Sequence, residues 1–112
     1  MFNSKMYKKY YPIKSSFDIA NMNVAEQKKL IYWIKSLSED IRLHNTNSLK
    51  KAMQYRENEY RVIEANCTDD NIASLCNKIS RNSDSITDNE ISLINAVLYR
   101  HKKQKLFGIC KK

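Results

Sequence analysis

The sequence predicts an all-α protein, a compact bundle of about four helices with a basic N-terminal arm and a projecting basic C-terminal helix end. One proline and one glycine, Gly108, occur among the 112 residues. Tight β-hairpin turns need residues that tolerate a positive φ angle, and a β domain would need several such turns. Apolar residues also recur at helical spacing behind polar capping residues. We therefore expect helices throughout.

The length of the chain indicates one domain with a hydrophobic core. We divide it into a basic aromatic arm at 1–22, a helical bundle at 23–107 and a basic tail at 108–112. A content of 42% hydrophobic and 29% charged residues is too apolar for a disordered chain. This composition is typical of a globular protein.

The sequence favours a cytoplasmic location inside a reducing compartment. No run of about 18 apolar residues is present, so we expect no membrane association. The charged, aromatic N-terminus does not resemble a signal peptide. Three cysteines, an odd number, indicate free thiols and not a disulfide framework.

The N-terminal segment mixes lysines with aromatic residues, as in YKKYYPIK. Pro12 prevents a continuous helix through it, so we expect an extended arm. A short helical turn is expected at 17–20.

The first long helix is predicted over 24–43, where Asn23 and Glu26 form a capping box. Spacings of three and four residues place its apolar side chains on one stripe. That stripe consists of Leu30, Ile34, Leu37 and Ile41. Tyr32 and Leu43 point the opposite way, which indicates an exposed or partner-facing surface.

A second helix is predicted over 49–66, with Arg56 in the middle of its apolar face. A buried arginine needs a partner, so one interpretation is a salt bridge, or a side chain that extends past the core to water. The other is that this face contacts a partner protein with Arg56 at its centre.

Two further helices have clear N-terminal caps. Thr68 precedes a helix over 69–80, and Thr87 with Glu90 forms a capping box for the last helix, which ends before Gly108. The predicted core contains Leu30, Ile34, Leu37, Ile41, Ile72, Leu75, Ile79, Ile91, Ile94 and Leu98. Beyond Leu98 the apolar stripe stops, so we expect the helix end to project into solvent with His101 neutral and exposed.

The net charge of +8 is concentrated at the two ends of the chain. Residues 1–14 and 98–112 contain ten Lys or Arg and no acid, whereas the remainder is slightly acidic. Such basic ends suit phosphate groups or an acidic protein surface. The alternative for the C-terminal cations is that they complement the helix dipole and keep a small protein soluble. The N-terminal tyrosines either offer stacking surfaces or pack over a helix pair to complete the core. The candidate binding residues are Lys8, Lys9, Tyr10, Tyr11, Lys14, Arg100, Lys102, Lys103 and Lys105.

Catalytic and metal-binding signatures are absent from the sequence. Cys67, Cys76 and Cys110 show no metal-ligand spacing with the two histidines, and a single glycine cannot form a glycine-rich phosphate loop. We therefore predict a protein that is not an enzyme and that needs no metal or cofactor.

Two functions remain. The first is a non-enzymatic, nucleic-acid-associated regulatory or accessory protein that makes mainly phosphate contacts. Its Asn-, Ile- and Lys-rich composition is typical of AT-rich phage or plasmid genomes. The alternative is a small modulator or inhibitor that binds an acidic surface of a partner protein with its basic ends. Tyr32, Leu43 and Arg56 are the candidate protein interface, and self-association is left open.

Overall fold

The computed structural model describes residues 5–44, 49–51 and 54–107, with side chains for 6–44, 49–51 and 54–102. The described residues form helices and no strands, which confirms the predicted all-α class. The elements are α1 (Lys5–Tyr10), α2 (Ser16–Ala20), α3 (Val24–Leu43), α5 (Glu57–Ala65), α6 (Asp69–Arg81), the 3₁₀ turn η1 (Ser83–Ser85) and α7 (Asp88–Phe107).

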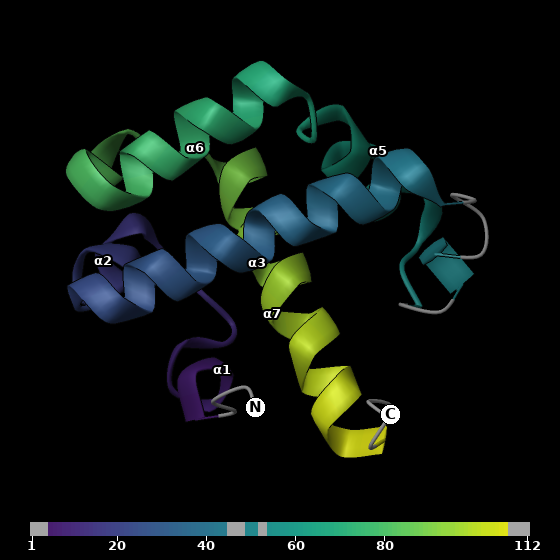
Figure 1. Cartoon of the computed structure of the whole chain (residues 1–112), viewed down its shortest axis with the longest axis horizontal. Helices are drawn as coiled ribbons and strands as arrows, with labels where there is room; N and C mark the ends of the chain where they lie inside the picture. The colour runs from purple at the N-terminus through teal and green to yellow at the C-terminus, as the bar shows by residue number, and fades with distance from the viewer. Residues whose placement is uncertain (1–4, 45–48, 52–53, 108–112) are drawn as a thin grey trace.

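Helix α7 is the central element of the bundle. It contacts α1, α3 and α5, and α3 crosses over it while α6 packs along α3 (Figure 1). Four α7 side chains are almost completely buried: Leu93, Ile94, Val97 and Leu98. Every residue of the predicted core is buried except Ile91, which is half-buried.

Helix α3 has the predicted bounds, and its predicted capping box is present. The Glu26 amide donates to Asn23 Oδ1 at 2.8 Å, and the Asn23 amide donates to Glu26 Oε1 at 3.0 Å. Glu26 Oε1 also accepts a hydrogen bond from the Tyr10 hydroxyl at 2.8 Å. The same carboxylate therefore caps α3 and attaches α1 to it.

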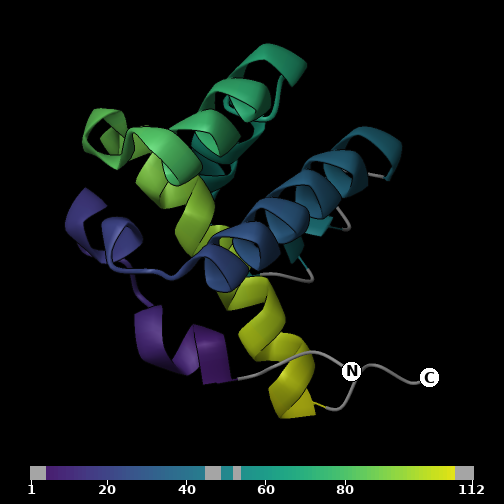
Figure 2. The same ribbon diagram turned by 60° about the vertical axis from the view of Figure 1, so that its left-hand side comes forward.

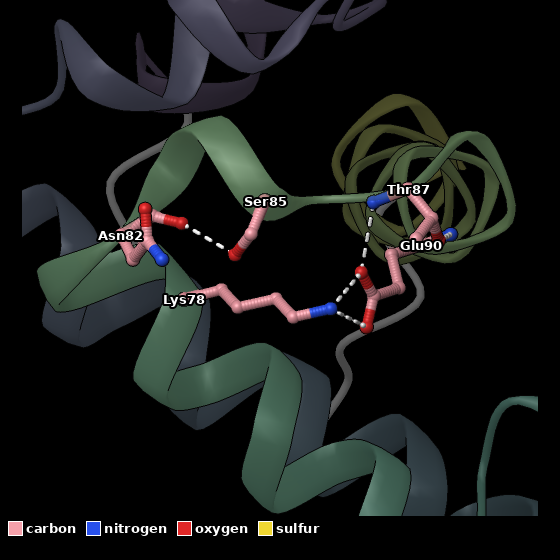
Figure 3. A network of polar contacts seen from close by, with 5 residues as sticks. All are labelled: Lys78, Asn82, Ser85, Thr87 and Glu90. Atoms are coloured by element: carbon pink, nitrogen blue, oxygen red, sulfur yellow. Dashed lines mark hydrogen bonds and ion pairs between the residues drawn. The ribbon is translucent and has the colours of Figure 1, made fainter.

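The start of α7 also has its predicted capping box, at Thr87 and Glu90. Glu90 is buried, and its two carboxylate oxygens accept hydrogen bonds from Lys78 Nζ of α6 at 3.0 and 3.3 Å (Figure 3). A buried carboxylate requires such partners because desolvation penalises its charge. This local cap therefore also joins two helices.

The predicted continuous helix over 49–66 was wrong. Gln54 has a φ of 58°, in the left-handed region, and α5 begins only at Glu57. Arg56 is the N-cap residue of α5, its side chain is 86% exposed, and it forms an ion pair with Glu59 at 3.5 Å. A continuous helix would have directed this arginine into the core without a buried acid beside it. The break places the Arg56 charge in solvent. Helix α5, which begins after it, still buries Tyr60 and Ile63.

The expected extended N-terminal arm was also wrong. Residues 5–10 form α1, and the side chains of Met6, Tyr7, Tyr10 and Ile13 are buried in the common core. The spacing of Met6, Tyr7 and Tyr10 places them on one face of α1, so Lys8 and Lys9 occupy its outer face. Pro12 follows the helix end, as expected, and the helical turn predicted at 17–20 is present as α2.

We predict that Ile94→Ala lowers the free energy of unfolding by about 2–5 kcal/mol, because it removes buried methyl groups and leaves a cavity. Ile94 is 0% exposed. Urea unfolding, followed by the fluorescence of the single tryptophan, Trp33, measures this change.

The control variant is Leu43→Ala, whose side chain is 72% exposed near the end of α3. It should change the free energy of unfolding by less than about 0.5 kcal/mol. Equal effects of the two variants would contradict the central position of α7.

Candidate nucleic-acid interface

The fold brings the two basic ends of the chain together. Helix α1 lies beside the C-terminal half of α7, as both views show (Figure 2). Lys102 Nζ lies 5.4 Å from the centroid of the Tyr11 ring, within cation–π distance. We call Lys8, Lys9, Lys14 and Lys102 the joined basic surface. Lys8, Lys9 and Lys14 are exposed, and Lys102 is half-buried.

The segment after α1 is held on α7 by one asparagine. The Ile13 amide donates to Asn95 Oδ1 at 2.6 Å, and Asn95 Nδ2 donates to the Ile13 carbonyl at 3.0 Å. Lys14 directly follows this contact and is exposed. The backbone of the basic segment is therefore anchored while the lysine side chain remains accessible.

Lys9 and Tyr10 are linked to Glu26 of α3. Lys9 Nζ lies 4.0 Å from Glu26 Oε2 and 5.1 Å from the Tyr10 ring. The backbone hydrogen bond from Asn23 is the main cause of the lowered pKa of Glu26. Burial opposes it, and the Tyr10 hydroxyl and Lys9 add smaller lowering effects. The sequence leaves both stacking and core packing open for Tyr10, and its side chain is buried in the core. Lys9 remains exposed beside it.

Arg100 was predicted to contact a partner, but it forms an ion pair with Asp40 of α3. Both side chains are largely covered, with 20% and 23% exposure. Arg100 therefore links α7 to α3, and its charge is partly neutralised within the protein.

His101 is buried, which corrects the expectation that it is exposed. Its ring stacks on Trp33 with a centroid distance of 4.0 Å. Burial, with smaller effects of the neighbouring Arg100 and Lys29 charges, lowers its pKa to about 4. The core thus extends one turn beyond Leu98, because the indole ring of Trp33 on α3 covers the His101 ring. Lys103 and Lys105 lie in α7, but their side chains are outside the described residues.

The residues predicted as a protein interface lie in different elements. Tyr32 is exposed on α3 at an open groove of about 690 Å³ between α3 and α6. Leu43 is exposed at the end of α3, and Arg56 precedes α5.

Sequence reasoning missed two residues next to Tyr11. Tyr99 of α7 lies 6.2 Å from Tyr11, and Tyr55, before α5, lies 6.5 Å from Tyr99, both between ring centroids. These tyrosines are 44 or more positions from Tyr11 along the chain, so no local spacing relates them to it. Only the high tyrosine content, seven in all, was a signal.

Among the described residues, no group of three or more His, Cys, Asp or Glu side chains is arranged to hold a metal ion. Burial raises the pKa of the Cys67 thiol to about 12, so that it stays protonated at neutral pH. In the described part of the chain, none of the helices has the length and apolar character required to cross a bilayer.

Comparisons with protein-family models, curated proteins and solved structures found no match to this chain.

We predict that His101 reduces stability in acid. Below pH 6.5 the unfolded chain binds a proton at His101, whereas the folded chain binds it only near pH 4. The free energy of unfolding should therefore fall through this window, by up to about 3 kcal/mol. Urea unfolding at several pH values, in wild type and in His101→Phe, measures this contribution.

His101→Phe keeps an aromatic ring against Trp33 but cannot titrate, so its loss of stability in acid should be smaller. His44→Phe, which changes an exposed histidine, is the matched control and should follow the wild type. Parallel curves for His101→Phe and wild type would contradict the burial of a neutral imidazole.

Proposed function

We propose that this protein binds nucleic acid through the joined basic surface, as a non-enzymatic accessory or regulatory protein. The observation that carries the proposal is the packing of α1 against α7, which unites lysines from both ends of the chain. Lys8 and Lys102 are 94 positions apart in sequence, yet they belong to neighbouring helices. A united surface can contact successive phosphates, which separate arms would do less cooperatively.

The ion pairs leave positive charge available on the joined basic surface. Five of the ten cations between residues 15 and 97 are paired with acids, as in Arg42 with Asp69 and Lys78 with Glu90. Within the described residues, no ion pair involves Lys8, Lys14 or Lys102. Unneutralised charge on neighbouring helices attracts a polyanion and makes its binding dependent on salt.

The chemistry of the joined basic surface favours phosphate contacts over base recognition. Its lysines are flexible point charges, which bind phosphate without a fixed geometry. Of the two tyrosines predicted to stack, Tyr10 is buried and Tyr11 is partly exposed. We therefore expect this surface by itself to select little among sequences.

The test is the fourfold variant K8Q/K9Q/K14Q/K102Q, which removes four positive charges from the joined basic surface. We expect its affinity for a labelled single-stranded oligonucleotide to fall at least about tenfold at low salt, measured by fluorescence anisotropy. The slope of log affinity against log salt should become shallower by roughly 0.7 for each phosphate that the variant no longer neutralises.

The matched control K35Q/K51Q/R61Q/R81Q removes the same charge from exposed side chains on other elements. It should retain most of the affinity and the salt slope. If both variants lost oligonucleotide affinity equally, net charge alone would explain the binding, and the joined basic surface would have no special role. Wild-type protein that binds no oligonucleotide at low salt would overturn the proposal in favour of an acidic protein partner.

A further inference from the structure

A cavity of about 490 Å³ lies beside the joined basic surface. Its walls come from Tyr11 after α1, the segment around Tyr55 before α5, helix α5 itself, and α7 with Tyr99. This volume is within the range of pockets that hold small organic ligands. Val62, Ile63 and Ala96 contribute an apolar part of the lining. We call this cavity the tyrosine pocket.

The three tyrosine rings of the pocket suit a planar aromatic ligand. Their planes are tilted by 32° between Tyr11 and Tyr99 and by 49° between Tyr55 and Tyr99. Such rings offer π faces and edges on which a base can stack. The lining beside these rings also contains polar side chains, including those of Asn58 and Glu59.

The polar lining selects a ligand head group that donates hydrogen bonds. Glu59 contributes a carboxylate, and Asn58 and Asn89 contribute amides, whereas no Lys or Arg of the described residues lines the cavity. Carboxylate oxygens only accept hydrogen bonds, so an anionic group is disfavoured inside. The ion pair of Glu59 with Arg56 is solvent-exposed, and such a pair is readily exchanged for a ligand.

Tyr11 connects this pocket to the basic surface. Its ring lines the cavity and also lies beneath the Lys102 ammonium. A ligand with a planar head in the pocket would therefore have a cation at hand for a phosphate attached to it. A nucleotide has both parts, whereas a methylated amine or a free aromatic compound lacks the phosphate.

We infer that the tyrosine pocket binds an unpaired guanine base. Guanine presents two adjacent N–H donors, N1 and N2, which match the two oxygens of the Glu59 carboxylate. On the same base-pairing edge, adenine and cytosine each carry an amino group next to an acceptor nitrogen. Uracil carries one N–H between two carbonyl oxygens there. A carboxylate would repel these acceptors. This inference rests on the proposed function and adds a base preference to it.

The experiment uses the full chain with four probes: the 5′-monophosphates of guanosine, adenosine, cytidine and uridine. Binding is followed by ¹H–¹⁵N NMR titration. We expect the guanine nucleotide to shift the amide signals of Asn58, Glu59 and Asn89 and to bind at least about tenfold more tightly than the others, the discrimination typical of a paired contact. Equal affinities, or shifts confined to other residues, would overturn the inference.

Glu59→Gln should reduce the guanine preference to about twofold or less, because the amide presents one acceptor and one donor in place of two acceptors. Glu59 is exposed, so this variant should fold. Glu64→Gln changes an exposed acid on the same helix that does not line the cavity, and it should keep the preference. A preference unchanged in Glu59→Gln would overturn the assignment.

Guanosine without phosphate separates this inference from the proposed function. The variant K8Q/K9Q/K14Q, which leaves Lys102 against Tyr11 in place, should bind guanosine as the wild type does, although its oligonucleotide affinity is reduced. Oligonucleotide binding without any guanine preference would support nucleic-acid binding by the basic surface and would overturn guanine binding in the tyrosine pocket. Guanosine binding without oligonucleotide binding would support guanine binding in the tyrosine pocket and would overturn nucleic-acid binding by the basic surface.

Discussion

The arrangement of the N-terminal third of this protein depends on the paired hydrogen bonds between Asn95 and the backbone of Ile13. A side-chain amide offers an N–H donor and a C=O acceptor, which match the C=O and N–H of a single residue outside regular secondary structure. Helix α1 ends at Tyr10, before Pro12, so the backbone of the segment that follows needs hydrogen-bond partners from elsewhere. Asn95 supplies them from the central helix, and the Ile13 side chain is buried at the same point.

Residues next to the Asn95–Ile13 contact pack against different helices. Tyr10, at the end of α1, faces α3 and donates to Glu26, while Tyr11 faces α7, where it meets Tyr99 and Lys102. Lys14 directly follows the Asn95 contact in sequence and is exposed to solvent. A displacement of this short segment would therefore disturb the attachment of α1, the wall of the tyrosine pocket and the joined basic surface together. The basic surface and the pocket share one structural support.

The helix starts were predictable because their determinants are local. Asn23 with Glu26 and Thr87 with Glu90 each satisfy backbone amides within four residues, so the sequence alone contains the whole interaction. Their second functions were not predictable. Nothing near Glu90 in sequence indicates that Lys78 completes its hydrogen bonds from another helix. Periodicity shows which face of a helix is buried, and it does not show what covers that face.

The candidate site was predicted less well than the fold, because its residues depend on contacts between distant segments. A count of charges in the sequence treats every cation at the two ends as able to bind a partner. In the structure, Arg100 forms an ion pair with Asp40, and Lys9 lies near Glu26. Trp33 also covers His101, where the sequence suggests a solvent-facing helix end. The charge that remains for a partner at the two ends is therefore smaller than the sequence total, and it lies on α1, the segment after it and α7, which contacts α1.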